Sequence, residues 1–321
     1  MASSRIASII GATGNQGASV VDALLKDGTF TPRAITRNPD SEASQKLKAR
    51  GVEVVKADTA DKASLISALQ GSEAVFGVTL SVWSPDQLSE QTHGRNMIDA
   101  SNEVGVKFFV FSLDEQNMNI ASSSSTPNLT KLSGGKYNVP IYDDKADVEE
   151  YLKVSGLANA SLLLGGFAET LCDPSRPRLK KTDTGFDLPV SKYSATELEA
   201  WTLALFKNYT DSSKNISGKS YPVVTAELTY PDLVALISKS THFLVACIEK
   251  PELRNDAALG VEVTFTSVPT CGRPMLDKMY AAHAEYNGLN TLTPVPNPDL
   301  VGAKFGTVEE FVETELKERF G

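Results

Sequence analysis

The stretch RIASIIGATGNQG, residues 5–17, decides the fold class of this chain. Residues 5–10 are apolar and β-branched enough to form a buried strand. After the glycines, the chain continues into an amphipathic helix that should end at Gly28, with an apolar face made of Val20, Val21, Leu24 and Leu25. A strand, a glycine turn and a helix in this order are typical of the βα unit that binds a dinucleotide.

The three glycines of this turn have separate physical roles. Gly11 permits the tight turn, Gly14 lets the backbone approach a pyrophosphate, and Gly17 lets the helix pack close to its strand. The free N–H groups and the positive end of the helix dipole then face the phosphates. The alternative, a strand–helix turn without a ligand, is disfavoured by the strand before it and the helix after it. We therefore expect these turn residues to bind a cofactor: Gly11, Thr13, Gly14, Asn15, Gln16 and Gly17.

A second predicted strand over residues 33–36 ends at Arg37, which stands 20 residues after Gly17. Near this position an NAD-binding protein carries an acidic residue that binds the ribose hydroxyl group. The guanidinium fork of an arginine instead suits a 2′-phosphate. We therefore predict NADP(H) as the cofactor, with Arg37 on the phosphate and Asn38 beside it. The alternative for Arg37 is a solvated surface side chain.

Polar residues follow two further predicted strands. Asp58 comes after the strand at residues 52–55, at the edge where an open α/β sheet binds its ligand. Asp58 could bind the adenine amino group or cap the following helix, and the sequence favours neither. Thr79 follows the strand at residues 74–78 and is expected to contact the cofactor. Trp83, in the next loop, either lines the cofactor and substrate pocket or packs within the fold.

Strands and helices alternate along the first half of the chain. This alternation predicts an α/β domain over residues 1–170, with a doubly wound parallel sheet of the Rossmann type. Further elements at about 195–228 are expected to complete this sheet, and one predicted helix spans about residues 85–103. Later in the chain the alternation stops, and prolines and polar turns become frequent. A smaller α+β lobe is therefore expected over residues 171–321.

The composition excludes several classes of protein. The chain of 321 residues carries a net charge of -9 and lacks the stripe of lysines and arginines that marks a nucleic-acid binder, so a regulatory role would pass through a protein partner. Its three cysteines lie far apart, and its three histidines stand alone, so we expect neither disulfides nor a metal site. The first strand begins close to Met1, and no apolar run has membrane-spanning length. We expect a cytoplasmic protein, with a nuclear presence left open.

Short motifs along nearly the whole chain share one family pattern: residues 11–17 (GATGNQG), 36–39 (TRNP), 57–58 (AD), 144–151 (DKADVEEY), 166–169 (GFAE), 305–307 (FGT) and 309–311 (EEF). With them the sequence resembles the NmrA-like family of atypical short-chain dehydrogenases/reductases, close to the isoflavone-reductase-like enzymes. The spacing G-x-x-G-x-x-G and Arg37 are the most specific parts. The resemblance implies a Rossmann lobe that binds NADP(H) and a small C-terminal lobe that closes a cleft over the nicotinamide.

Lys145 is the main candidate for the chemistry. Typical short-chain dehydrogenases use Tyr-x-x-x-Lys, in which the lysine lowers the tyrosine pKa from about 10 and holds the nicotinamide ribose. Here Ile141 stands four residues before Lys145, so the usual proton donor is absent, and Tyr142 is a second candidate on the same helix. The isoflavone-reductase-like enzymes also lack that tyrosine and use the lysine. The resemblance therefore implies that Lys145 holds the ribose and acts as a general acid or base, and the alternative is a surface lysine.

Two further residues are candidates for contacts with the substrate and the nicotinamide. Ser112, at the end of the strand over residues 107–111, is expected to form a hydrogen bond with the substrate. Phe167 is expected to flank the nicotinamide ring and to line the substrate pocket with Trp83. Many relatives carry Arg-Pro shortly before the matching phenylalanine, whereas this chain has Leu-Gly at residues 164–165. Its nicotinamide contacts therefore depart in part from those of the family.

The family divides into two functional classes, and both remain open for this chain. The first is an NADPH-dependent reductase that acts on a small, fairly apolar carbonyl, imine or ene substrate. The second is a non-catalytic NADP(H) sensor that acts through a regulatory protein, with a possible lid in the loop over residues 117–136. The missing tyrosine favours the sensor, and Lys145 at the expected position favours the reductase. The substrate and the oligomeric state are not determined by the sequence.

Overall fold

The computed structural model describes residues 5–81, 88–114, 128–164 and 198–223, with short strand segments between residues 180 and 246 and two single helical residues, Lys278 and Ala281. The chain divides into two compact units. Unit 1 comprises residues 1–164, 198–223 and 274–304, and unit 2 comprises residues 165–197, 224–273 and 305–321.

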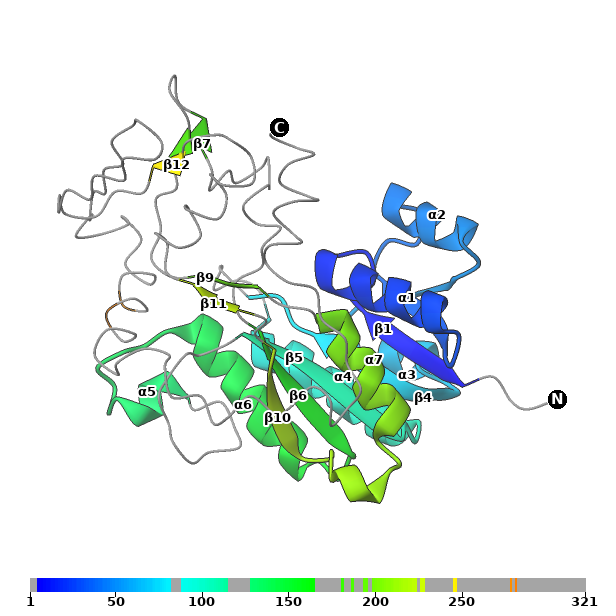
Figure 1. Cartoon of the computed structure of the whole chain (residues 1–321). Helices are drawn as coiled ribbons and strands as arrows, with labels where there is room; N and C mark the ends of the chain where they lie inside the picture. The colour runs from blue at the N-terminus through cyan, green and yellow to red at the C-terminus, as the bar shows by residue number, and fades with distance from the viewer. Residues whose placement is uncertain are drawn as a thin grey trace. The chain divides into compact units, whose positions relative to one another are not determined.

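Unit 1 is built on a seven-stranded sheet with the order β10-β6-β5-β4-β1-β2-β3 (Figure 1). All neighbouring strands run parallel. The strand order reverses between β1 and β4, which makes the carboxyl ends of these strands the switch point where such sheets bind ligands. The strands are β1 (Ile6–Ile10), β2 (Thr31–Thr36), β3 (Glu53–Lys56), β4 (Ser72–Val78), β5 (Phe108–Asp114), β6 (Asn159–Leu164) and β10 (Lys219–Val223).

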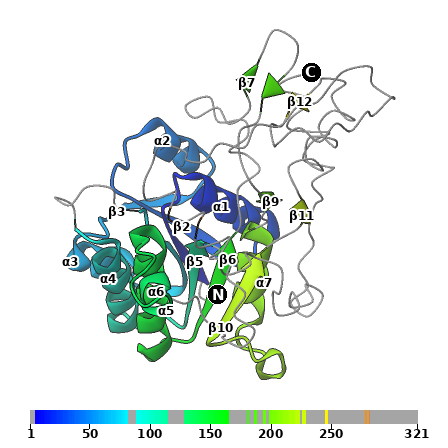
Figure 2. The ribbon, with the colours of Figure 1, turned by 90° about the vertical axis from the view of Figure 1, so that its left-hand side faces the viewer.

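Helices cover both faces of this sheet, as Figures 1 and 2 show. One face carries α1 packed against α7, and the other carries the row α3, α4 and α6. This arrangement confirms the predicted doubly wound fold. The helices are α1 (Asn15–Asp27), α2 (Glu42–Ala49), α3 (Lys62–Ala68), α4 (Glu90–Glu103), α5 (Leu129–Leu132), α6 (Pro140–Val154) and α7 (Leu198–Asn208), with a 3₁₀ turn η2 (Ser212–Lys214).

Unit 2 contains two small sheets among its described residues. Three strands form one of them, in the order β12-β8-β7, and two antiparallel strands, β9 and β11, form the other. These strands are β7 (Lys180–Lys181), β8 (Phe186–Asp187), β9 (Tyr193–Ala195), β11 (Ala226–Leu228) and β12 (Val245–Ala246).

The core of unit 1 explains why its strands are nearly continuous apolar runs. A parallel strand covered on both faces cannot alternate between buried and exposed side chains. Phe76 of β4 and Phe108, Phe109 and Phe111 of β5 are accordingly fully buried. The ring of Phe206, from α7, meets that of Phe108 edge to face, with the centroids 6.5 Å apart.

The glycine turn brings α1 against the end of β1. Gly11 has a φ of +77°, in the region that favours glycine. A Cβ atom at Gly17 would lie 2.3 Å from the carbonyl oxygen of Gly11. Gly28 ends α1 with a φ of 74° and donates its N–H to the carbonyl of Leu24. The tight turn and the close packing expected from the sequence are therefore present.

The helix predicted from about residue 85 begins later. Its first residue is Glu90, and the side chain of Ser89 caps it by accepting a hydrogen bond from the N–H of Thr92. A serine at this position satisfies one of the free amides of the first turn, which favours a helix start here. Trp83 and its neighbours at 82–87 lie outside the described residues. The corrected start places Glu90 in the first turn of α4.

The amino end of β1 is joined to β4 by a part-buried ion pair. Arg5 donates to Glu73 through Nε at 3.0 Å and Nη2 at 2.6 Å, and its guanidinium lies 4.1 Å from the ring centroid of Phe30. The hydroxyl group of Tyr209 donates to the same carboxylate at 2.7 Å. The hydrogen bond from Arg5 lowers the pKa of Glu73, and burial raises the pKa of Tyr209 to about 12.

We expect Gly17→Ala to destabilise unit 1 by about 3 kcal/mol or more, because its new methyl group meets backbone atoms that cannot move aside. Gly14→Ala is the matched control, since a Cβ there would lie 3.4 Å from its nearest neighbour, and it should cost at most about 1 kcal/mol. Urea unfolding followed by circular dichroism measures both. Equal losses for the two variants would contradict this assignment.

We expect Glu73→Gln to destabilise unit 1 near neutral pH and to have a smaller effect at about pH 3. The pKa of Glu73 is depressed in the fold, so its contribution is present above the ordinary value of 4.5 and is lost as the pH falls through the folded pKa. Urea unfolding at both pH values tests this. Glu42→Gln, at the exposed pair with Lys46, should change stability little at either pH. A pH-independent effect of Glu73→Gln would contradict the prediction.

Candidate functional site

The candidate site lies along the carboxyl ends of the central strands of unit 1. The glycine turn follows β1, and Arg37 follows β2. Asp58 follows β3, Thr79 follows β4, and Ser112 lies near the end of β5. Because these strands are parallel, their carboxyl ends meet at one edge of the sheet, next to the switch point.

Gly14 is the N-cap residue of α1, and no side chain caps this helix. With φ at -92° and an ordinary van der Waals distance from a new Cβ to Gly11, the chain itself does not require glycine at this position. Thr13 and Asn15 on either side are exposed. The turn therefore presents bare backbone and uncapped amides, which suits close approach by a phosphate group.

A pocket of about 220 Å³ lies at the ends of β2 and β3, and Arg37 and Lys56 both line it. The register of the two strands pairs Lys56 with Thr36, the residue before Arg37. Sequence reasoning identified Arg37 and missed Lys56. The available signal was a second basic residue at the end of the next predicted strand. The rest of the lining is Ala57, Asp58, Asp61 and Ser64.

The helix-capping alternative for Asp58 is wrong. Asp61 caps α3, because its carboxylate accepts hydrogen bonds from the N–H groups of Ala63 at 3.0 Å and Ser64 at 3.2 Å. The carboxylate of Asp58 instead accepts a hydrogen bond from the N–H of Ala60 at 2.9 Å. Asp58 lies three residues before the capping position and does not cap the helix. Asp58 thus remains a lining residue of the pocket.

Asn38 is exposed and forms a local turn. Its side-chain oxygen accepts a hydrogen bond from the N–H of Asp40 at 3.1 Å, and its N–H donates to the hydroxyl of Thr36. Asn38 does not line the pocket that contains Arg37.

Ser112 and Gln16, both sequence-predicted site residues, contact each other. The hydroxyl of Ser112 donates to Oε1 of Gln16 at 2.6 Å, and Ser112 is 2% exposed. This bond joins the end of β5 to the first turn of α1 across the switch point. The structure therefore brings together two residues that lie 96 positions apart in the chain.

Lys145 is buried at the end of β4. Its Nζ donates to the carbonyl oxygen of Thr79 at 3.1 Å, to the hydroxyl of Thr79 at 3.0 Å and to Oε1 of Glu90 at 2.5 Å. The hydroxyl of Thr79 also donates to Oε1 of Glu90. Thr79 and Lys145, predicted from separate parts of the chain, thus meet, and they meet around a glutamate that sequence reasoning missed.

Tyr142 lies one turn before Lys145 on α6, and it is 8% exposed. Its ring belongs to a small apolar cluster with Leu129, Tyr137 and Val139. This cluster fixes the first turn of α6 to α5.

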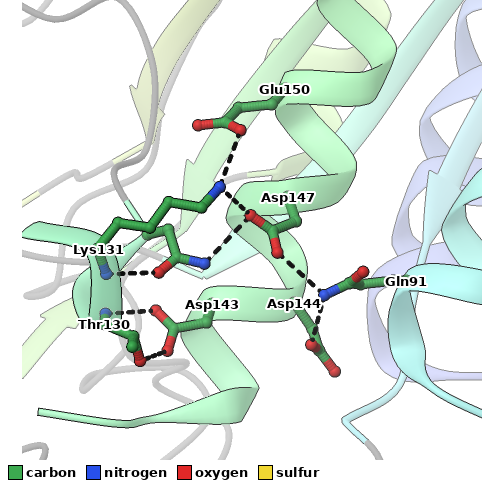
Figure 3. A network of polar contacts seen from close by, with 8 residues as sticks. Gln91, Thr130, Lys131, Asp143, Asp144, Asp147 and Glu150 are labelled. Carbon is green, nitrogen blue, oxygen red and sulfur yellow. Dashed lines mark hydrogen bonds and ion pairs between the residues drawn. The ribbon is translucent and has the colours of Figure 1, made fainter. Parts of the chain in front are cut away.

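Acidic residues along α6 contact residues of the neighbouring helices, as Figure 3 shows. Gln91, in the first turn of α4, donates from Nε2 to Asp144 and to Asp147, both at 3.0 Å. Lys131 of α5 donates to Asp147 at 2.8 Å and to Glu150 at 3.2 Å. Burial raises the pKa of Asp144. These contacts hold α6, and with it Lys145, between α4 and α5.

The remaining predicted site residues cannot be placed. Trp83 and Phe167 lie outside the described residues, and so does most of the loop expected as a lid. Within the part of the chain that the structure describes, no group of three or more metal-binding side chains is present. Among the same residues, no helix combines the length and the apolar character needed to cross a membrane.

The chain is similar to curated fungal and amoebal proteins with NmrA-like domains. It is 37% identical to the NmrA-like oxidoreductase FrzB of Cladobotryum sp over 156 residues, 47% of this chain and 43% of FrzB. It is 33% identical to the oxidoreductase malD of Malbranchea aurantiaca over 211 residues, 61% of this chain and 59% of malD. The matches to these two relatives therefore span less than two thirds of their length. DDB_G0286605 of Dictyostelium discoideum is 28% identical over 73% of this chain and 76% of that protein.

Two solved structures illustrate the shared fold. NmrA, a negative transcriptional regulator solved in complex with NADP, superposes with a TM-score of 0.69 at 16% identity, over 97% of this chain and 95% of NmrA. The NADPH-dependent quinone oxidoreductase QOR2 of Escherichia coli, solved with NADPH, has a TM-score of 0.63 at 23% identity, over 97% of this chain and 99% of QOR2.

The sequence pattern of the NmrA-like family matches residues 3–312, nearly the whole chain. The seven-stranded parallel sheet with its glycine turn agrees with this match. The chain belongs to the NmrA-like family.

Proposed function

We propose that the protein is an NADPH-dependent oxidoreductase that reduces a small, fairly apolar carbonyl, imine or ene compound. The observation that carries the proposal is the pocket at the ends of β2 and β3, which Arg37 and Lys56 line together with Asp58 and Asp61. Two cations at this position suit a 2′-phosphate, which carries two negative charges and several acceptor oxygens. In a chain with a net charge of -9, such a pairing beside a dinucleotide turn favours NADP(H) over NAD(H).

The glycine turn supports the same ligand. Gly14 leaves the amino end of α1 bare, and the amides there face the edge of the sheet where the strands end. A diphosphate placed on this helix end would be stabilised by the amides and by the helix dipole. Asp58, in the neighbouring pocket, is suited to accept a hydrogen bond from an adenine amino group.

Chemistry in this proposal depends on Lys145, Thr79 and Ser112. When bound, the cofactor supplies the hydride. Lys145 holds the nicotinamide ribose and donates a proton to the substrate, and Ser112 orients the substrate by a hydrogen bond. FrzB, malD and QOR2 are each named as oxidoreductases, which supports the proposal of this class of reaction for the present chain.

A second candidate function is a non-catalytic NADP(H) sensor that acts on a protein partner. The observation that favours it is that the ammonium group of Lys145 uses its three N–H donors in hydrogen bonds to Thr79 and Glu90. Ile141 in place of the usual tyrosine, and Tyr142 within an apolar cluster, favour the same class. NmrA, a regulator solved with NADP, is a structural precedent for binding without a named reaction.

We expect Arg37→Ala and Lys56→Ala each to weaken NADPH binding by about tenfold to a hundredfold, since a charge-assisted hydrogen bond is worth roughly 1.5–3 kcal/mol. Binding of NADH, which lacks the 2′-phosphate, should change little. Lys46→Ala, on the exposed face of α2, controls for the general loss of a positive charge. Isothermal titration calorimetry measures all eight affinities, those of the wild type and the three variants for the two ligands. Equal losses of affinity for NADPH and NADH would show that the two cations do not bind the 2′-phosphate.

We expect the wild-type protein to consume NADPH with at least one of benzaldehyde, cyclohexenone, benzoquinone and pyrroline. Lys145→Met should lower kcat by about a hundredfold or more if the lysine acts as the proton donor. Retained binding of adenosine 2′,5′-bisphosphate shows that the variant is folded. Undiminished turnover in Lys145→Met would remove this lysine from the mechanism. Tight NADPH binding without turnover, together with an NADPH-dependent change in proteolysis, would favour the sensor.

A further inference from the structure

Lys145 and Glu90 form a buried ion pair between two helices. Lys145 is 4% exposed and Glu90 is fully buried, and Nζ lies 2.5 Å from Oε1. Removing two opposite charges from water is costly, and apolar residues of similar size stabilise a helix contact at least as well. The pair therefore calls for an explanation other than stability.

The pair lies at the ligand edge of the sheet. Thr79, the residue directly after β4, contacts both partners through one hydroxyl group. Its carbonyl oxygen accepts a further hydrogen bond from Lys145. Glu90 is in the first turn of α4, where the helix dipole favours a negative charge. The end of β4 and the first turn of α4 thus fix the position of one ammonium group, which α6 carries.

The contact between α4 and α6 does not depend on this pair. Gln91 already bridges the two helices through Asp144 and Asp147. Farther along, α4 has a glycine, Gly94, at which a Cβ atom would lie 2.5 Å from both methyl groups of Val148. The helices therefore pack closely through polar and apolar contacts that are separate from Lys145.

Glu90 also retains an unused acceptor. Its Oε2 atom is buried and has no hydrogen-bond partner among the described residues. Buried polar atoms in native proteins nearly always have partners, and each exception calls for an explanation such as a catalytic role or a bound water. A carboxylate kept only to hold two helices together would be expected to use both oxygens.

We propose that Glu90, together with Thr79, is a positioning residue for Lys145: it holds the ammonium at the end of β4, where exchange of the hydrogen bond to the Thr79 carbonyl lets the ammonium contact the nicotinamide ribose of NADPH. This inference rests on the proposed function and deepens it. Glu90 provides the counter-ion that keeps a charged lysine in a buried position, and Thr79 fixes its direction through the shared hydroxyl. Neither residue touches the adenosine half of the cofactor, which lies at Arg37 and Lys56 in the proposal.

The test compares two ligands by calorimetry: NADPH, and adenosine 2′,5′-bisphosphate, which has no nicotinamide ribose. Glu90→Gln keeps the shape of the side chain and removes its charge. The variant should bind NADPH about tenfold more weakly than the wild type does, and its affinity for the bisphosphate should stay within about twofold of the wild-type value. Glu149→Gln is the matched control, because Glu149 of α6 is fully buried like Glu90 and is paired with Lys153 at 3.0 Å. This variant should keep both affinities within about twofold of the wild-type values.

A second pair of variants keeps the inference testable if Glu90→Gln does not fold. Thr79→Val removes the shared hydroxyl and should weaken NADPH alone, whereas Thr79→Ser retains it and should bind NADPH like the wild type. Unchanged or tighter NADPH binding by Glu90→Gln and Thr79→Val overturns the positioning role. An equal loss of affinity for NADPH and for the bisphosphate overturns it as well. A wild-type protein that binds neither ligand overturns the proposed function, and the inference with it.

Discussion

The backbone contact between Gly17 and Gly11 is the constraint on which unit 1 depends. Because no methyl group fits between α1 and the first turn, the helix and its strand meet backbone to backbone. This contact sets the amino end of α1 at the carboxyl end of β1, between β2 and β4, where the strand order reverses. The parallel register then delivers the remaining candidate residues to the same edge, with Arg37 after β2 and Thr79 after β4.

The fold class and the family could be predicted from the sequence because local and long-range signals agree. Strands buried on both faces are apolar runs, and helices with one apolar face alternate with them. The exact element ends depend on single caps, and this is where prediction was less accurate. Ser89 starts α4 later than the hydrophobic pattern suggested, and Asp61, not Asp58, starts α3.

The candidate site could be predicted only where a residue type is unusual in its own motif. Arg37 stands where an acid is common, and Lys145 stands in a family motif, so both could be named as candidates. Glu90 and Lys56 lie in no sequence motif that would single them out. Glu90 is buried only because α6 brings Lys145 to it from 55 positions away, and Lys56 is notable only because β3 pairs with β2. Such contacts follow from topology, which a single sequence shows indirectly.

The ion pair of Arg5 and Glu73 lies at the amino ends of β1 and β4, and the candidate site lies at the carboxyl ends of the same strands. One strand, β4, thus carries a structural anchor near its beginning and Thr79 directly after its end. The two edges are separated by the length of a buried strand, so changes at one edge leave the other undisturbed. An engineer can therefore reinforce the amino edge before remodelling the carboxyl edge.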